Sequence, residues 1–194
     1  MAPTIVLITG ASRGLGRGLA QRFLAKPDHA VIAVNRDPSG ATSTALQDLP
    51  KGEGSRLIIV KLDSAVEADA VEAVKTLETQ GIDSLDIVVA NAGISEVYPA
   101  VSAMNASDLQ RHITINVLGV IWLYQAVLPL LRRSSDPKWV TMGSSAGALE
   151  VGFFLFACEC NPFIHSFIHS LFFYSIPSHP QQKRRAQLTS RSKH

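Results

Sequence analysis

Five short apolar segments, rich in β-branched residues, recur along the first three quarters of this 194-residue chain. Each is a continuous apolar run, which is typical of a strand buried on both faces of a parallel sheet. We expect strands at 4–9, 30–35, 56–62, 85–91 and 138–143. Helical patterns lie between them at 15–25, 65–80 and 107–132. The alternation predicts an α/β fold, a doubly wound, Rossmann-type parallel sheet with helices on both faces.

The longest predicted helix has recognisable signals at both ends. Ser107 and Gln110 have the spacing of a capping box, so we expect the helix to begin at Ser107. Pro129 lies near its other end, where a missing N–H group predicts a break or kink before Arg132.

The composition changes abruptly at about Glu150. Seven of the eight Phe, both Cys and five of the 18 Lys and Arg fall in the last 44 residues, but only one of the 16 acids does. We therefore predict one Rossmann-type domain over 1–150 and an atypical tail over 151–194 that is poorly ordered or non-native. The pyrimidine-rich codons of that tail suggest the hypothesis of translated non-coding sequence. A retained intron fits, because the codon of Val151 must begin with GT.

Charge and the ends of the chain argue against several classes of function. The net charge is only +2, and the basic strip Lys183–Arg185 is interpreted as a solvated tail, so no nucleic-acid partner is expected. Residues 1–10 have neither a basic leader region nor a cleavage site, which favours a cytoplasmic protein. The apolar stretch 153–176 carries too many polar residues for a membrane span, which leaves a membrane tether as a weak alternative.

The cysteines and histidines of the tail do not predict a metal site. Cys158 and Cys160 are too close in sequence for an unstrained disulfide. His165 and His169 could share a helix face, but neither a Cys2His2 spacing nor a catalytic Glu accompanies them. We expect no bound metal.

Spaced glycines follow the first predicted strand. Gly10, Gly14 and Gly16 come after Thr9 at the start of a helix, with the spacing TGxxxGxG. This arrangement allows a tight turn, keeps side chains out of the path of a phosphate and lets the helix pack closely on the strand. A purely structural turn is the alternative interpretation.

Four motifs in a fixed order make residues 3–149 resemble the short-chain dehydrogenase/reductase family. They are TGASRGLG at 9–16, NAG at 91–93, Asn116, and GSSAG at 143–147. The resemblance implies that Asn91 supports the central strands beside the cofactor and that Asp63 lies at the adenine. A helix cap is the alternative role for Asp63. The residues expected at the cofactor are Gly10, Ser12, Arg13, Gly14, Leu15, Gly16, Asn35, Arg36, Asp63, Asn91, Ala92 and Gly93.

The charges at the end of the second predicted strand favour NADP(H) over NAD(H). An acid there would accept a hydrogen bond from the ribose 2'-hydroxyl of NAD, but this chain has Asn35 followed by Arg36. Arg13 and Arg36 could reach one 2'-phosphate from opposite sides, as the same pattern does in the family. Asp37 would oppose the phosphate if it turned inward, and we expect it to point to solvent.

The resemblance also implies two catalytic residues. Ser144 matches the serine that holds the substrate's carbonyl oxygen, with Ser145 or a structural turn as alternatives. Asn116 matches the asparagine that supports a water-linked proton path. A buried amide in so apolar a helix would cost stability unless it had hydrogen-bond partners.

The family's proton-donating tyrosine and its lysine are missing from the expected positions. Those positions hold Ala157 and Asn161, and no tyrosine in the chain is followed four residues later by lysine. Without this pair the usual family catalysis is not expected. The missing segment would also supply the last family strands and much of the subunit contact. Its loss would leave the fifth strand as an exposed edge.

The sequence therefore supports three hypotheses. The first is an NADP(H)-dependent reductase of a small-molecule ketone or aldehyde in a truncated or altered form, similar to fungal members that include ketoreductases acting on aromatic polyketides. The second is a catalytically inactive nucleotide-binding protein. The third and weakest is a membrane-tethered form. Family members are often homo-oligomers, through elements that this chain partly lacks.

Overall fold

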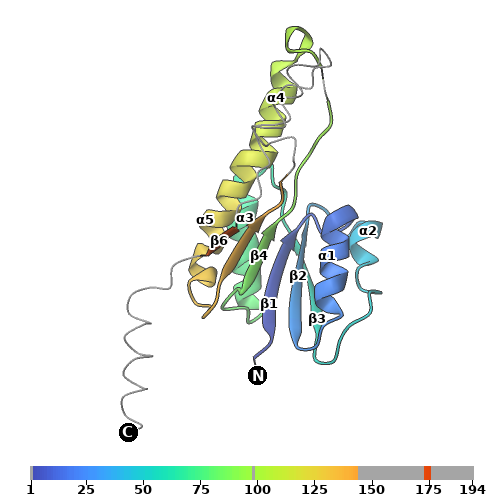
Figure 1. Cartoon of the computed structure of the whole chain (residues 1–194), viewed down its shortest axis with the longest axis vertical. Helices are drawn as coiled ribbons and strands as arrows, with labels where there is room; N and C mark the ends of the chain where they lie inside the picture. Colours follow the sequence, from blue (N-terminus) through green and yellow to red (C-terminus); the bar gives the residue numbers. More distant parts are fainter. Residues whose placement is uncertain (1, 98, 144–172, 176–194) are drawn as a thin grey trace.

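The computed structural model describes residues 2–97, 99–143 and 173–175. A six-stranded sheet in the order β3-β2-β1-β4-β5-β6 runs through its centre (Figure 1). Five neighbouring strands are parallel: β1 (Thr4–Thr9), β2 (His29–Asn35), β3 (Arg56–Lys61), β4 (Ile87–Ala90) and β5 (Lys138–Thr141). They confirm the predicted doubly wound α/β fold. The strand order reverses between β1 and β4, and the carboxyl edge at such a reversal is where open α/β sheets bind ligands.

The sixth strand corrects one expectation about the edge of the sheet. β6 (Phe173–Ser175) pairs antiparallel with β5, with Lys138 opposite Ser175 and Val140 opposite Phe173. The expectation that β5 is an unpaired edge is therefore wrong at these positions. A short segment within the predicted tail supplies the hydrogen-bonding partners that an edge strand lacks.

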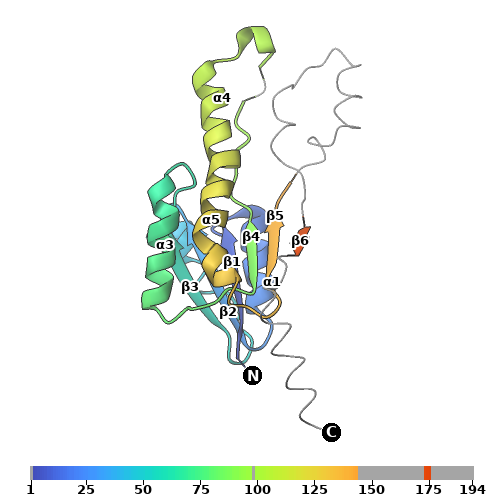
Figure 2. The same ribbon diagram turned by 90° about the vertical axis from the view of Figure 1, so that its left-hand side faces the viewer.

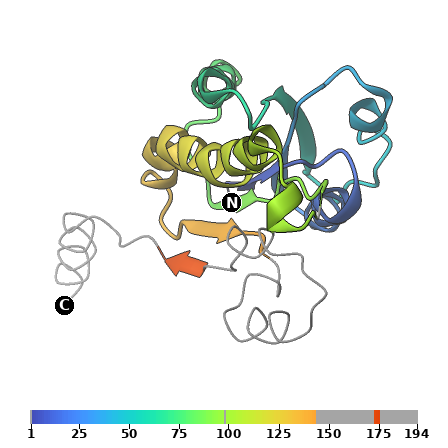
Figure 3. The same ribbon diagram turned by 90° about the horizontal axis from the view of Figure 1, so that it is seen from above.

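Helices cover both faces of the sheet, as predicted. α1 (Gly14–Leu24) and the short α2 (Ala41–Thr44) lie on one face, while α3 (Glu67–Thr79) and α5 (Gly119–Leu131) pack side by side on the other (Figures 2 and 3). Alternate residues of a strand point to opposite faces. In β1, Leu7 belongs to the cluster under α3 and α5, whereas Ile8 belongs to the cluster under α1.

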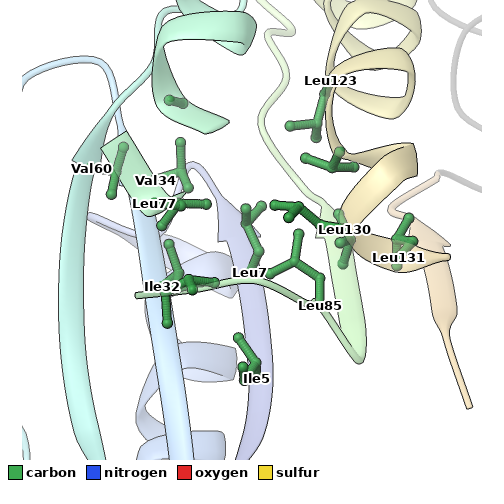
Figure 4. Close-up of a cluster of buried hydrophobic side chains, with 14 of the residues drawn as sticks. Ile5, Leu7, Ile32, Val34, Val60, Leu77, Leu85, Leu123, Leu130 and Leu131 are labelled. Carbon is green, nitrogen blue, oxygen red and sulfur yellow. The ribbon is translucent and has the colours of Figure 1, made fainter. Parts of the chain in front are cut away.

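The larger hydrophobic cluster fixes α3 and α5 on the sheet (Figure 4). Leu7 and Ile32 from the strands meet Leu77 of α3 and Leu130 of α5, and all four side chains are fully buried. Truncating such a leucine to alanine typically costs about 2–5 kcal/mol. The positions of α3 and α5 are thus set by the core.

One long helical segment follows a single 3-10 turn at Val101–Ala103 and consists of three consecutive parts. They are α4 (Ala106–Ile113), a π-helical turn η2 (Thr114–Leu118) and α5. The predicted capping box at Ser107 is wrong, because the helix begins one residue earlier and Asn105 is its N-cap. The main-chain carbonyl of Asn105 accepts the N–H of Asp108 instead.

Of the predicted break or kink at Pro129, the break is not observed, since α5 continues through it to Leu131, and the kink stays a prediction. Pro129 has no N–H group, so the carbonyl of Gln125, four residues earlier, lacks its helical partner. Both residues are exposed, so water can satisfy that carbonyl. The irregularity lies upstream, in the π turn. The segment Ala106–Leu131 is long and apolar enough to cross a membrane, but a core helix passes the same test, and Leu123 and Val127 lie in the core.

Candidate coenzyme site

The turn between β1 and α1 lies at the point where the strand order reverses. Gly10 and Gly14 have positive φ values of 64° and 56°, a conformation that residues with a side chain rarely adopt. Gly10 donates its N–H to the carbonyl of Val34, which ties the turn to the end of β2. α1 begins at Gly14, so its unpaired N–H groups face the carboxyl edge of the sheet.

Gly16 is the most tightly enclosed residue of this turn. A Cβ atom added there would lie 2.6 Å from Nδ2 of Asn91 and closer still to the carbonyl oxygen of Gly10. Real Cβ atoms essentially never approach another atom so closely. The close packing predicted for Gly16 is present, and it presses the first turn of α1 against the ends of β1 and β4.

A threonine and an asparagine join the ends of β1 and β4. Oγ1 of Thr9 accepts the N–H groups of Asn91 and Ala92, at 3.0 and 2.9 Å. In return Nδ2 of Asn91 donates to the carbonyl of Thr9 at 2.9 Å and to that of Gly10 at 3.3 Å. The predicted structural role of Asn91 is therefore observed. Sequence analysis missed its partner Thr9, whose position next to the first glycine was the available signal.

Asn35 at the end of β2 has an unusual environment. Its side chain is buried, and within the described residues neither its amide nitrogen nor its amide oxygen has a hydrogen-bond partner. Leaving such a group unpaired typically costs about 1–3 kcal/mol. An amide that can both donate and accept suits a ribose hydroxyl, so this residue fits the sugar of a nucleotide at the carboxyl edge.

The two arginines expected at the phosphate are both exposed. Among the described residues, neither Arg13 nor Arg36 is held in an ion pair, so both guanidinium groups are available to a ligand. Leu15 is 73% exposed and Ser12 is half-buried in the same turn.

Asp37, the acid next to Arg36, is exposed, as expected. Its Oδ1 accepts the hydroxyl of Ser39 at 2.7 Å and the N–H groups of Ser39 and Gly40 at 3.0 Å. The Ser39 hydroxyl, followed by these N–H groups and the Arg36 charge, lowers the pKa of Asp37. The Asp37 carboxylate is thus hydrogen-bonded within its own turn.

The turn between β3 and α3 carries Asp63. Its Oδ1 accepts the N–H of Ala65 at 2.9 Å, while its own N–H donates to Oδ2 of Asp69 at 2.8 Å. Asp69 also accepts Nζ of Lys61 at 2.6 Å, and this hydrogen bond is the main cause that lowers the pKa of Asp69. Asp63 does not cap α3, because Val66 is the N-cap.

Asn116 is buried in the π turn and has the partners that its burial requires. Its Oδ1 accepts the N–H of Ile94 at 2.8 Å, and its Nδ2 donates to the carbonyl of Ile94 at 2.9 Å. The side chain therefore fastens the segment after β4 to the long helix. Its part in a proton path stays a prediction.

A second fastening, which sequence analysis missed, lies one turn earlier. Nε2 of the buried His112 accepts the N–H of Glu96 at 3.3 Å, and the carboxylate of Glu96 pairs with Arg111 at 2.7 Å. The only available signal was that Arg111 and His112 lie five and four residues before Asn116, about one helical turn away. Together these contacts hold residues 94–96 beside Gly93, which is exposed.

Several predicted residues lie outside the part of the chain that the structure describes. They include the proposed catalytic Ser144 with its alternative Ser145, the positions Ala157 and Asn161, both cysteines, and His165 and His169. The described residues thus bring the glycine turn, Asn35, the Asp63 turn and Asn91 to the carboxyl ends of neighbouring parallel strands.

Comparison with known proteins agrees with this geometry. Residues 4–158 match the sequence family described as short chain dehydrogenase. The short chain dehydrogenase gsfK of Penicillium aethiopicum is 45% identical over 150 residues, which are 76% of this chain and 59% of that protein. The norsolorinic acid ketoreductase nor1 of Dothistroma septosporum is 46% identical over 136 residues, 70% of this chain and 50% of that one.

A solved structure has the same fold. The NADPH-bound carbonyl reductase from chicken fatty liver superimposes with a TM-score of 0.69 at 28% identity, over 81% of this chain and 66% of that one. The chain spans between half and three fifths of the length of the two fungal relatives.

Proposed function

This chain belongs to the short-chain dehydrogenase family, and we propose that it binds NADP(H) for the reduction of a ketone or aldehyde. The observation that carries the proposal is the glycine turn at the β1–β4 crossover, with the unpaired amide of Asn35 beside it. A phosphate group can lie against the open turn, because Gly14 leaves space where a side chain would stand.

Each half of the coenzyme has residues that would hold it. The N–H groups at the start of α1 would bind the pyrophosphate, the amide of Asn35 the adenosine ribose, and Asp63 the adenine amino group. Asn91, Ala92 and Gly93 would border the nicotinamide side, held by Thr9 and by the Asn116–Ile94 contact. When bound, NADPH supplies a hydride to the carbonyl carbon while the carbonyl oxygen gains a proton.

Preference for the phosphorylated coenzyme is argued from charge. Asn35 is neutral where NAD-specific sites have an acid, and Arg13 and Arg36 offer two guanidinium groups to a 2'-phosphate. Asp37 keeps its negative charge beside Arg36, but its Oδ1 is held within its own exposed turn by Ser39 and Gly40. The chicken carbonyl reductase structure contains the same coenzyme.

The finer proposal for the substrate is a polyketide-type carbonyl. It is supported by the ketoreductase names of relatives that are 43–46% identical to this chain. Ser144 would hold the carbonyl oxygen, with Asn116 supporting the path of the proton. A cytoplasmic location and self-association belong to the same proposal.

A second candidate function is coenzyme binding without turnover. One observation favours it, because no tyrosine in the 194 residues is followed four positions later by a lysine. A tyrosine side chain without a nearby cation has a pKa near 10, so it takes part poorly in proton transfer at neutral pH.

One experiment separates these candidates. The purified chain would be titrated with NADPH by fluorescence, and then mixed with NADPH and an aromatic ketone while absorbance at the coenzyme's band is followed. Saturable binding with ketone-dependent oxidation supports the reductase, and binding without oxidation supports the second candidate. The absence of binding would overturn both.

A further inference from the structure

A glycine on the long helix touches the turn that carries Asp63. Gly119 is buried, and a Cβ atom added to it would lie closer than 3.0 Å to the carbonyl oxygen of Ser64 and 3.0 Å from the Ser64 Cβ. Because the nearest atom is main chain, it cannot rotate out of the way. Gly119 therefore lets the β3–α3 turn lie directly against the helix, and α3 packs beside α5 (Figure 2).

The two sides of this contact belong to different parts of the site. Ser64 directly follows Asp63, whose conformation is held by the N–H of Ala65 and by Asp69. Gly119 donates its N–H to the carbonyl of Thr114 and so closes the π turn that contains Asn116. The contact thus joins the segment expected at the adenine to the segment that fastens the nicotinamide side.

We propose that Gly119 is a positioning residue for adenine recognition, because the absence of its side chain sets where the Asp63 carboxylate lies. The inference rests on the proposed function, in which NADPH binds at this edge with its adenine amino group facing Asp63. It concerns a residue that makes no contact with the coenzyme itself.

An added methyl group would move the turn rather than the helix. The helix is anchored by the Asn116–Ile94 hydrogen bonds and by the buried Leu123. Asp63 and Ser64 are only half-buried and Ala65 is exposed, so the turn can be displaced. An ordinary contact requires a shift of roughly 1 Å. A hydrogen bond of about 2.9 Å between the Asp63 carboxylate and the adenine amino group would be lost after a displacement of that size.

The test compares NADPH with its deamino analogue, in which hypoxanthine replaces adenine and the amino group is lost. We expect the wild-type chain to bind NADPH about tenfold more tightly than the analogue, the ratio typical of one hydrogen bond to a charged group. Gly119→Ala should reduce this ratio to about twofold or less, mainly by weakening NADPH. A general loss of packing would weaken both coenzymes equally and leave the ratio unchanged.

Three further variants complete the experiment. Gly18→Ala is the matched control, because Gly18 is a helical glycine with nothing within 4 Å of an added Cβ, and its ratio should stay near tenfold. Asp63→Ala should abolish the ratio, and adding Gly119→Ala to it should change the ratio no further. Asp69→Ala removes the acceptor of the Asp63 N–H and should also lower the ratio. This variant provides a second test of turn position if Gly119→Ala does not fold.

The outcomes distinguish the inference from the proposed function. A wild-type chain that binds no NADPH overturns the proposed function and the inference with it. A chain that binds NADPH but keeps its tenfold ratio in Gly119→Ala, or in Asp69→Ala where the first variant is unfolded, overturns the inference alone. A wild-type ratio near one also overturns it, because Asp63 would then not read the amino group.

Discussion

The two sides of the β1–β4 crossover are built in different ways. On the β1–β3 side, the glycine turn, Asn35 and the Asp63 turn all follow directly from the ends of consecutive strands, and main-chain geometry determines most of the site. On the β4–β5 side, residues 94–96 are held by side chains from a helix further along the chain, Asn116 and His112. The β1–β3 side can thus be inferred from a short stretch of sequence, whereas the β4–β5 side depends on side chains contributed by a later segment.

The largest expected effect of a single substitution is at the β1–β3 side. Gly16→Ala should destabilise the chain by about 3 kcal/mol or more, since the new methyl group meets the Gly10 carbonyl and the Asn91 amide. Urea unfolding with a fluorescence readout measures the loss, and NADPH binding should disappear with it. An unfolding free energy close to that of the wild type would show that the turn is not constrained by this contact.

A somewhat smaller effect is expected on the β4–β5 side. Asn116→Ala removes both hydrogen bonds to Ile94 and leaves main-chain groups without partners, which should cost about 2–3 kcal/mol. Ser107→Ala on the same helical segment is the control. Its side chain is exposed and makes no hydrogen bond among the described residues, so its effect should stay within about 0.5 kcal/mol. Equal thermal shifts in the two variants would contradict the fastening role of Asn116.

The Lys61–Asp69 pair gives a prediction with a defined pH dependence. Since the hydrogen bond from Lys61 lowers the pKa of Asp69, the pair's contribution is present above the unfolded value of about 3.9 and is lost as the pH falls through the folded value. Asp69→Asn should cost about 1 kcal/mol or less at pH 7, because Lys61 is largely exposed.

Chemical denaturation of both proteins at pH 7 and at pH 3 provides the measurement. The difference between wild type and Asp69→Asn should shrink at the lower pH. A difference that grows on acidification would mean that the charge of Asp69 opposes folding.

The smallest expected effect is that of Gly18→Ala, in the same helix as Gly16. Gly18 is exposed and unobstructed, in contrast to Gly16, so Gly18→Ala should stabilise the chain by up to about 1 kcal/mol through helix propensity. Differential scanning calorimetry would detect the rise in melting temperature. A destabilised Gly18→Ala would mean that α1 is in contact with something that the described residues do not include.

Much of the fold followed from local sequence patterns. The parallel strands and α3 lie within a few residues of their predicted positions, because buried apolar runs and amphipathic spacing are local signals. The π turn at Thr114–Leu118 was not predicted, because the apolar spacing of the helix does not distinguish π- from α-helical hydrogen bonding. The pairing of β6 with β5 was missed because the partner lies far away in sequence.

The site was predicted in part. The glycine turn, Asn91 and Asn35 lie at the carboxyl ends of neighbouring strands, as their places in the sequence implied, and their contacts with a coenzyme stay predictions. Thr9 and His112 were missed, because only the folded chain brings their acceptors and donors together. The close approach of Gly119 to Ser64 is likewise invisible in sequence, where α3, β4 and α4 lie between them.

The central claim is that the carboxyl edge of the sheet binds NADP(H) through the glycine turn, with two arginines at the 2'-phosphate. Its most direct test is the ratio of NADH to NADPH dissociation constants, measured for the wild type and for the double variant Arg13→Ala/Arg36→Ala. We expect a wild-type ratio of at least about tenfold in favour of NADPH, the value of one charge-assisted hydrogen bond, and a ratio near one in the double variant. A preference that is unchanged when both arginines are removed would contradict the claim.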